Sequence, residues 1–332
     1  MSITTIIIAL IVFGIIVTVH EAGHFLVAKF FKVTVHEFAV GMGPKIAGKK
    51  YKETEYSLRA LPLGGYVRME GEDEDSKDPN GFNNKPVLQR MAIIFAGPFM
   101  NFLLTILILS ILFSVSGVPS RFVGGTAPDM PAAEAGLIEG DEILRINGKE
   151  VRTPEQVSRE IMDSQGEISV DVRRGKQILR FEMTPTVQEG RRMIGIQYAN
   201  RKSSGAAIVY GFRQTFALAR QMLGFLGKLV TGKMGMGGLS GPVGIISEVG
   251  KAAQTGFASV VGLAALISLN LGLINLMPIP ALDGSRILFQ IIELIRGKKI
   301  DPNKEGYVHM VGMICLLALM IVITYFDILK LV

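Results

Sequence analysis

The sequence has few charged residues and only one cysteine. Charged residues make up 19% of its 332 residues, whereas 49% are hydrophobic and the mean hydropathy is +0.39. Soluble domains carry about 25% charged residues, so this apolar surplus is too large for one soluble core, and disordered and collagen-like chains are excluded. The single Cys315 also excludes an intrachain disulfide and therefore a disulfide-stabilised scaffold.

The positive charge of the chain does not indicate binding to nucleic acid. The formal net charge is +6, but no basic cluster is interleaved with aromatic residues, so we expect no nucleic-acid partner. In a membrane protein, lysine and arginine instead orient the spans, because both are enriched in cytoplasmic loops.

Four runs with few or no charges are long enough to cross a lipid bilayer, which needs about 20 apolar residues. These runs are 3–19, 91–120, 252–282 and 306–326. The first has no basic start and no A-x-A-like cleavage site, which favours a membrane span over a signal peptide. A fifth run, 206–230, contains three cations and is predicted to be an amphipathic helix on the membrane surface, followed by a glycine-rich connection.

Two basic loops determine the predicted orientation. Residues 29–90 carry 11 Lys and Arg residues and residues 286–304 carry five, so both loops are expected on the cytoplasmic side of the cell membrane. Both termini and the long segment between the second and third spans are then extracytoplasmic. The predicted fold class is a multi-pass α-helical membrane protein with four transmembrane helices.

The segment between the second and third spans has the pattern of a small α/β domain. Residues 141–146 are typical of a strand, and Asn147-Gly148 is a strong hairpin-turn signal. Thr153-Pro154 is typical of a helix start. Residues 168–172 and 179–183 alternate apolar and polar side chains, which predicts a β-hairpin.

The first cytoplasmic loop contains an unusually apolar segment, residues 56–69. Gly64-Gly65 within it suits a tight turn between two strands, so a second β-hairpin is predicted there. The patterns divide the chain into eight segments: 1–30 (first span), 31–90 (cytoplasmic loop), 91–120 (second span), 121–187 (extracytoplasmic domain), 188–251 (amphipathic helix and glycine-rich connection), 252–285 (third span), 286–305 (cytoplasmic loop) and 306–332 (fourth span).

The sharpest chemical motif lies at the end of the first span. His20-Glu21-x-x-His24 places two histidines one helical turn apart on the same face. Two neutral imidazoles at this spacing can bind one Zn²⁺, and Glu21 beside them can take a proton from a water on the metal. Ionisable side chains in a membrane are costly and usually functional, which favours a zinc site over a helix end that merely meets water.

A catalytic zinc site takes three protein ligands and keeps a fourth position for water. His36 and His309 are candidates for the third ligand, but the first lies in a polar loop and the second at the start of a span. Asp283 is the better candidate, because it ends a long uncharged run after Pro278 and Pro280, which cannot both sit in a regular helix. Irregular backbone at membrane depth is tolerated only where it is buried or lines a wet cavity.

Together these motifs resemble the site-2 protease family of intramembrane zinc metalloproteases, and especially its bacterial RseP-like branch. The resemblance rests on His20-Glu21-x-x-His24, on Asn275-x-x-Pro278-x-Pro280-x-Leu282-Asp283-Gly284, and on a domain between the second and third spans. Gly97-Pro98-Phe99-Met100-Asn101 and Leu239-Ser240-Gly241-Pro242-Val243-Gly244 also resemble that branch. The similarity covers nearly the whole chain.

The resemblance implies that the inserted α/β domain is PDZ-like, with residues 135–141 as its hallmark, and that residues 56–69 form a cytoplasmic, membrane-associated β-hairpin. It implies transmembrane protein substrates, either anti-sigma factors or remnant signal peptides, cleaved in regulated intramembrane proteolysis. An unwound stretch of substrate would add to the hairpin as a strand. The substrate-binding residues implied in this way are Gly64, Gly65, Tyr66, Asn275, Pro278 and Pro280.

The mechanism expected from these residues is metal-assisted hydrolysis of a peptide bond. Zn²⁺ on His20, His24 and Asp283 would activate a water, with Glu21 as the proton acceptor. Two other functions stay open: a non-proteolytic membrane scaffold with a PDZ-like binding domain, and a metal transporter. The scaffold leaves the context of Asp283 unexplained, and a transporter would need more polar positions within its spans. The expected location is the plasma or inner membrane, with the lipid bilayer as a partner and the active site toward the cytoplasm.

Overall fold

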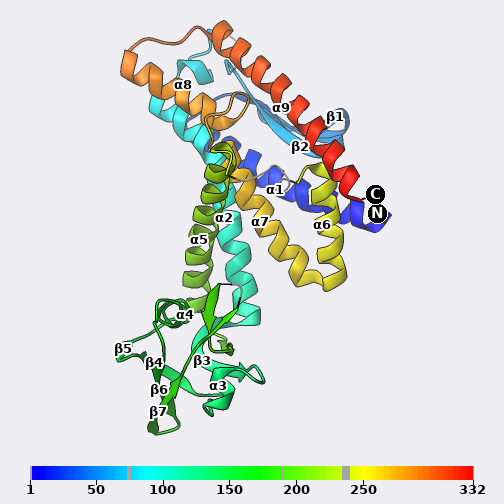
Figure 1. Cartoon of the computed structure of the whole chain (residues 1–332). Helices are drawn as coiled ribbons and strands as arrows, with labels where there is room; N and C mark the ends of the chain where they lie inside the picture. Colours follow the sequence, from blue (N-terminus) through cyan, green and yellow to red (C-terminus); the bar gives the residue numbers. More distant parts are fainter. Residues whose placement is uncertain (1, 73–75, 189, 234–239, 332) are drawn as a thin grey trace. The chain divides into compact units, whose positions relative to one another are not determined.

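The computed structural model describes residues 2–72, 76–188, 190–233 and 240–331 (Figure 1). Its contacts divide the chain into two units, one made of residues 1–109 and 211–332 and the other of residues 110–210. Two helices, α2 (Val87–Ser116) and α5 (Ser204–Val230), continue across the boundary between the units. Three glycines of the expected glycine-rich connection, Gly235, Gly237 and Gly238, lie outside the described residues.

The first unit is mainly helical. Besides parts of α2 and α5 it contains α1 (Ile3–Phe30), α6 (Pro242–Thr255), α7 (Phe257–Asn275), α8 (Asp283–Arg296) and α9 (Pro302–Leu331). Within the described residues, four helices are long and apolar enough to cross a membrane, namely α1, α2, α7 and α9. This result confirms the prediction of four long apolar helices.

The ends of several helices differ from the predicted ones. Helix α1 continues ten residues beyond His20 to Phe30, within the predicted segment 1–30, so the histidines lie inside the helix although the uncharged run ends before them. Gly256, at φ 135°, separates α6 from α7, which divides the expected third span. Asp283 begins α8 instead of ending a span, and α8 fills most of the expected cytoplasmic loop 286–305. Helix α8 has one polar and one apolar face, which is typical of a helix that lies between water and an apolar environment.

Helix α5 is a single continuous helix where the amphipathic helix was predicted. Its small residues Gly211, Thr215 and Ala219 are buried one helical turn apart. Ala219 packs in a cluster with Leu269 and Leu273 of α7. The expected position on the membrane surface stays a prediction.

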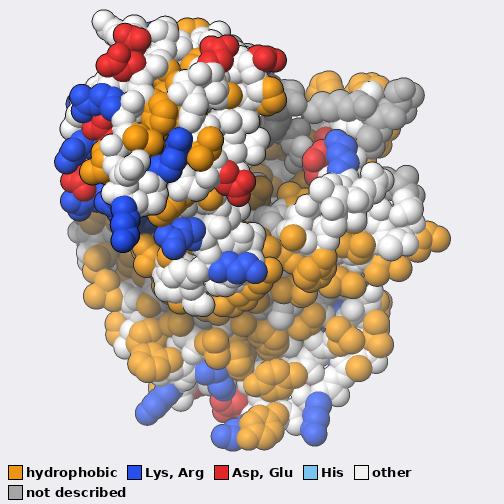
Figure 2. Space-filling view, turned by 90° about the horizontal axis from the view of Figure 1, so that it is seen from below, with side chains coloured by type: hydrophobic (Ala, Val, Ile, Leu, Met, Phe, Trp, Pro, Cys, Tyr) orange, Lys and Arg blue, Asp and Glu red, His pale blue; other side chains and the backbone are white. Residues whose placement is uncertain are grey.

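The long apolar helices expose large hydrophobic side chains along their length. Ile11 of α1, Leu107 of α2 and Ile321 of α9 are each more than half exposed. Figure 2 shows broad areas of hydrophobic side chains in which charged side chains are sparse. Large exposed areas of apolar side chains mark surfaces that contact other proteins or lipid.

A sheet of two long strands, β1 (Val35–Tyr51) and β2 (Thr54–Met69), packs beside α1. Its base shares a buried core with the end of α1 and the start of α2, which includes Val35, Val67 and Ile93. The sheet is not the simple hairpin expected around Gly64-Gly65. A local turn signal does not specify which strand lies alongside, because pairing depends on residues distant in the sequence.

Both strands of this sheet bend, and β1 inserts between two parts of β2. Residues 37–40 pair with 65–68 on one side and with 55–58 on the other, while the far end of β1 pairs with residues 54–59. Within the described sheet, residues 65–69 therefore have a partner on one side only. We call residues 65–69 the edge run. Its free side offers backbone hydrogen-bonding groups to another extended chain.

The second unit is an α/β domain built on one antiparallel sheet. The strand order is β10-β3-β4-β6-β7, with β5 paired to β4 and a separate β8–β9 pair. The elements in chain order are β3 (Val118–Thr126), α3 (Pro131–Glu134), β4 (Glu142–Ile146), β5 (Lys149–Glu150), α4 (Pro154–Met162), β6 (Ile168–Arg174), β7 (Gln177–Met183), β8 (Thr186–Gln188), β9 (Arg191–Met193) and β10 (Ile196–Arg201). Buried side chains that include Ile143, Ile146 and Val170 form its core.

The local signals in this domain produce the predicted elements, but the domain is longer than expected. The hydroxyl of Thr153 accepts a hydrogen bond from the N–H of Gln156 (3.3 Å), so α4 begins where predicted. Strands β6 and β7 form the predicted hairpin. The expected boundary was residue 187, whereas β10 extends to Arg201 and pairs with β3. The strands after residue 187 are short and lack a clear alternation of apolar and polar residues.

Candidate metal centre

A cavity of about 320 Å³ lies where α1, α2, α8 and the edge run meet. Its walls combine ionisable side chains with apolar ones, in a part of the chain that is otherwise strongly apolar. The lining residues are His20, Glu21, His24, Tyr66, Val67, Met69, Glu72, Ile94, Ala281, Leu282, Asp283 and Arg286.

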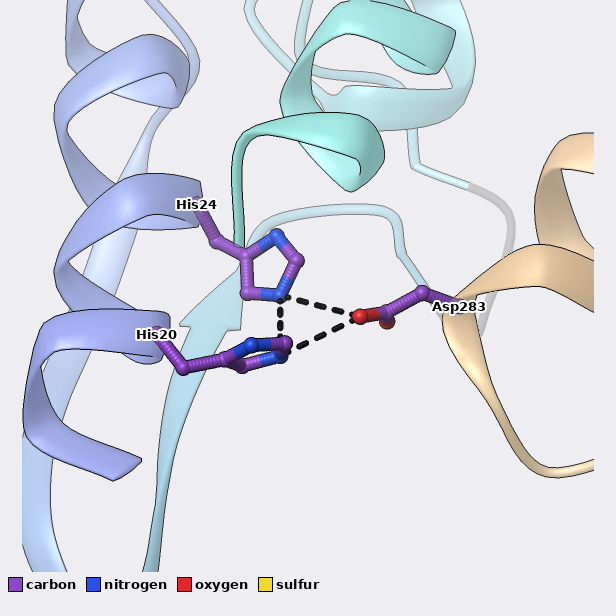
Figure 3. Close-up of side chains that lie close together, drawn as sticks. All are labelled: His20, His24 and Asp283. Atoms are coloured by element: carbon purple, nitrogen blue, oxygen red, sulfur yellow. Dashed lines mark hydrogen bonds and ion pairs between the residues drawn. The ribbon is translucent and has the colours of Figure 1, made fainter. Parts of the chain in front are cut away.

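Three side chains converge at this cavity from helices far apart in the sequence. Figure 3 shows His20 and His24 of α1 pointing toward Asp283 at the start of α8. The Nε2 atoms of the two histidines are 3.2 Å apart. The Oδ2 atom of Asp283 is 3.1 Å from Nε2 of His20 and 3.6 Å from Nε2 of His24. Among the described residues, these three form the one group of His, Cys, Asp or Glu side chains able to share a metal ion.

The separations fit a tetrahedral zinc ion. Tetrahedral ligands about 2.1 Å from zinc lie roughly 3.4 Å from one another, close to the observed 3.1–3.6 Å. The Oδ2 atom of Asp283 is buried and accepts no hydrogen bond. A buried carboxylate oxygen facing two imidazole nitrogens is costly unless a cation or proton joins them. The donor set therefore fits zinc with no further protein ligand.

A backbone carbonyl fixes the ring of His24. Its Nδ1 donates to the carbonyl oxygen of Ile93 on α2 at 2.9 Å, so the proton lies on Nδ1 and the lone pair of Nε2 faces the cavity. Metal-binding histidines usually donate their other ring N–H in this way, because that bond fixes both the tautomer and the ring orientation.

Asn101 of α2 provides the same support for His20. It is fully buried, and its side-chain amide lies 3.1 Å from Nδ1 of His20, while its Oδ1 accepts no hydrogen bond. The two ends of an amide have nearly the same shape. With Oδ1 toward His20, the ring N–H donates to it and the Nε2 lone pair is free for a metal. Either orientation of the amide leaves one of its atoms without a hydrogen bond. Only the orientation with Oδ1 toward His20 leaves the Nε2 lone pair of His20 free to bind a metal.

Two glycines allow α1 and α2 to approach closely enough for these contacts. A Cβ atom on Gly23 would lie 2.3 Å from the carbonyl oxygen of Ala96. A Cβ on Gly97 would lie 2.3 Å from Nε2 of His24 and 2.9 Å from Nε2 of His20. Any side chain at Gly97 would therefore occupy the space that the imidazoles need.

Glu21 and Asn275 also lie at the centre. Glu21 lines the cavity, and a Cβ on Gly65 of the edge run would lie 3.2 Å from Cγ of Glu21. The amide nitrogen of Asn275, the last residue of α7, is 3.5 Å from Nε2 of His20. The structure thus brings both residues to the three possible ligands.

Other residues singled out in the sequence lie away from the cavity. His36 pairs with Glu70 at 2.6 Å, and His309 accepts the backbone N–H of Ala281, so neither joins the cluster. Gly64, Pro278 and Pro280 do not line the cavity either. Pro278 is exposed and Pro280 is partly buried.

A buried carboxylate holds Tyr66 against the cavity. Glu37 accepts hydrogen bonds from Ser57 (2.6 Å), Arg59 (2.7 Å) and the hydroxyl of Tyr66 (2.7 Å). Burial raises the pKa of Glu37, but these hydrogen bonds and the charge of Arg59 outweigh it and lower the pKa to about 2. The hydroxyl bond to Glu37 therefore fixes the side chain of Tyr66, a residue that lines the cavity.

Sequence reasoning missed Asn101, Ile93 and Glu37 as functional residues. Asn101 belongs to the Gly97–Asn101 motif, and an amide within an uncharged span is a signal in itself. Ile93 acts through its carbonyl, which no side-chain pattern reveals. Glu37 lies in the predicted cytoplasmic loop 31–90, and only the fold of the sheet buries it.

The chain is similar to known proteins over nearly its whole length. The family model described as peptidase family M50 matches residues 8–319. A protein of Clostridium acetobutylicum is 39% identical over 333 residues, covering 99% of this chain and 98% of its own length. The regulator of sigma-W protease RasP of Bacillus subtilis is 34% identical over 420 residues, covering 100% of both chains. The zinc metalloprotease RasP of Geobacillus kaustophilus is 32% identical over 407 residues, covering 97% of both.

A solved structure with partial similarity is the PDZ domain of an SdrC-like protein from Listeria monocytogenes. It shares 23% sequence identity and covers 25% of this chain and 88% of its own. The TM-score is 0.22, which is too low to support an argument about the fold.

The support of His20 by Asn101 can be tested by its effect on metal binding. Asn101→Leu removes the acceptor for the ring N–H, so we expect zinc affinity to fall about 10- to 100-fold. Asn101→Asp keeps an acceptor oxygen at the same place and should bind zinc far more tightly than the Leu variant. Competition with a chelator measures both values. Equal zinc affinity of Asn101→Leu and the wild-type protein would contradict the role.

Proposed function

The chain belongs to peptidase family M50 and is an intramembrane zinc metalloprotease, and from this premise we propose that His20, His24 and Asp283 hold its zinc. The observation that carries the proposal is the buried Oδ2 of Asp283, which has no hydrogen-bond donor and faces two imidazole nitrogens. Family membership removes the scaffold and transporter alternatives. Zinc, when bound, polarises a peptide carbonyl and lowers the pKa of water toward about 7.

Glu21 acts as the general base and then as the general acid. It follows His20 in α1 and lines the same cavity, so its carboxylate faces the place where water meets the scissile bond. Glu21 accepts the proton of the attacking water and passes it to the leaving amine. Asn275 ends α7 beside His20, and its amide N–H donates to the substrate carbonyl.

The edge run binds the substrate backbone. A transmembrane helix hides its carbonyls in its own hydrogen bonds, so a stretch of substrate must unwind before it is cut. The free side of residues 65–69 then supplies partners for the exposed groups, as in other cases of strand addition. Gly65 places this strand directly beside Glu21. Gly64 contributes indirectly, through its positive φ of 93° in β2 just before the edge run. Pro278 and Pro280 contribute through the shape of the loop between α7 and α8.

The cellular setting follows from the four apolar helices and from the relatives. The protein is a plasma-membrane protein with membrane-embedded substrates. We propose that all four helices, α1, α2, α7 and α9, span the bilayer and that the sheet and metal centre lie toward the cytoplasm. The inserted domain is then extracytoplasmic and PDZ-like. The name of the RasP relative and the motif resemblance favour anti-sigma factors or remnant signal peptides as substrates.

Two substitutions separate the metal-binding role from the acid–base role. Asp283→Ala removes one of three ligands and should lower bound zinc and abolish cleavage. Glu21→Gln keeps the shape of the site, so zinc should stay bound while cleavage falls about 10²- to 10⁴-fold. Elemental analysis and cleavage of a transmembrane substrate measure the two effects. Full zinc occupancy in Asp283→Ala would remove Asp283 from the ligand set.

Proline substitutions in the edge run test strand addition. Proline removes a backbone N–H, and successive N–H groups of an edge strand point alternately toward its partner and outward. Val67→Pro and Arg68→Pro should therefore differ: one destabilises the sheet, and the other slows cleavage of a helical substrate without lowering thermal stability. Alanine at the same positions is the control. If both proline variants cleave at the wild-type rate, the edge run does not bind substrate.

Cysteine labelling tests the orientation. In a background with Cys315 replaced, a cysteine at Lys77 should react only from the cytoplasmic side and one at Lys149 only from outside. Lys77 belongs to the loop 29–90, whose 11 Lys and Arg residues predict a cytoplasmic position. A membrane-impermeant maleimide applied to intact and to opened cells gives the answer. Labelling of both positions from one side would refute the arrangement.

A further inference from the structure

The loop between α7 and α8 carries Asp283, and it contains a strained residue. Ala281, two residues before Asp283, has a φ of 76°. A residue with a Cβ atom rarely adopts this left-handed conformation, and it persists only where the surroundings hold it. The direction in which the chain enters α8, and so the position of the Asp283 carboxylate, depends on this residue.

One contact from another helix holds Ala281. Its backbone N–H donates to Nδ1 of His309 on α9 at 3.0 Å. The other hydrogen bonds donated by backbone N–H groups of residues 276–282 stay within α7 and the loop itself, and Pro278 and Pro280 have no N–H to donate. His309 therefore receives the backbone hydrogen bond that ties this loop to a different element.

The imidazole of His309 is itself held in place. Its side chain is 16% exposed, and its Nε2 lies 3.6 Å from Oε1 of Glu305, one turn earlier on α9, without forming a hydrogen bond. Its ring meets the ring of Phe289 of α8 edge-on, with centroids 5.8 Å apart. Because Nδ1 accepts a hydrogen bond, the ring proton lies on Nε2. His309 thus presents a fixed acceptor to the loop.

The backbone of α9 also touches the loop directly. A Cβ atom on Gly312, three residues after His309, would lie 2.3 Å from Cβ of Pro280 and 2.7 Å from its carbonyl oxygen. Helix α9 therefore packs against Pro280 without an intervening side chain, at the residue before Ala281. The hydrogen bond from Ala281 to His309 and the packing of Gly312 on Pro280 therefore both hold residues 280–281 against α9.

From these contacts we infer that His309 is a positioning residue for the metal site: through the backbone of Ala281 it holds the carboxylate of Asp283 against His20 and His24. The inference rests on the proposed role of Asp283 as a zinc ligand. It assigns α9, which contributes no side chain to the cavity, a role in holding the metal.

The test compares two amide substitutions in the full-length protein loaded with zinc. His309→Asn places its Oδ1 where Nδ1 lies and keeps the acceptor. His309→Gln places its oxygen near the position of Nε2 and loses the bond to Ala281. We expect His309→Gln to release zinc to a chelator about 10-fold faster than wild type, and His309→Asn to release it at close to the wild-type rate. The visible spectrum of the Co²⁺-loaded protein should change in the Gln variant only.

A second substitution tests the route through Ala281. Glycine adopts a positive φ without strain, so Ala281→Gly combined with His309→Gln should recover much of the lost zinc retention. This combination also serves if His309→Gln alone does not fold, which thermal unfolding of the zinc-free protein would reveal. Failure of the combination to recover zinc retention would overturn the inference.

The outcomes separate this inference from the proposed ligand set. If Asp283→Ala keeps its zinc, the ligand assignment fails and the inference fails with it. If Asp283→Ala loses zinc but the two His309 variants release zinc equally, whether slowly or fast, the hydrogen bond has no positioning role. In that case only the inference is overturned, and the ligand set stands.

Discussion

The metal centre depends on one contact between backbones, the crossing of α1 and α2 at Gly23 and Gly97. Neither position has room for a Cβ atom, and the atoms in the way at Gly23 belong to the main chain of Ala96, which cannot rotate aside. The close approach places the carbonyl of Ile93 within reach of His24. Residues of α2, which are far from the histidines in the sequence, therefore determine how the two imidazole rings are oriented.

Polar groups in this region are concentrated where three helices meet. The carbonyl oxygen of Asn101 accepts the hydroxyls of Thr105 (2.9 Å) and of Ser268 on α7 (3.0 Å). Gly272 of α7 lies against the same turn, since its Cβ would be 3.0 Å from the carbonyl oxygen of Pro98. An unpaired polar group is costly in apolar surroundings. Shifting α7 along α2 would break the hydrogen bond between Ser268 and Asn101, so this bond favours the observed packing of the two helices.

Local patterns in the sequence predicted the parts of the molecule that depend on nearby residues. The four apolar runs, the start of α4 at Thr153 and the hairpin of β6 and β7 follow from hydropathy, capping and alternation. The motifs around His20 and Asp283 also identified the three side chains that the structure brings together.

The parts that failed depend on contacts between distant segments. The insertion of residues 37–40 between two runs of β2 leaves no local trace, so Gly64-Gly65 suggested a hairpin that does not form. Helix α8 was missed for a different reason, because the five Lys and Arg residues of 286–304 indicated a cytoplasmic loop. Ile93 supports His24 through its backbone carbonyl, a group that every residue has. Only the crossing of α1 and α2 brings this carbonyl to the histidine, so no sequence pattern marks it.

Asp283 follows His20 and His24 by more than 250 residues of chain, and this spacing orders the biogenesis of the protein. On this ligand set, the two histidines emerge from the ribosome with the first span, whereas Asp283 arrives only after the domain and α7. A nascent chain with two imidazoles alone holds zinc weakly. The active site can therefore be metallated only after translation is nearly complete and the last helices have packed in the bilayer, so an unfinished or truncated chain has no proteolytic activity toward its neighbours in the membrane.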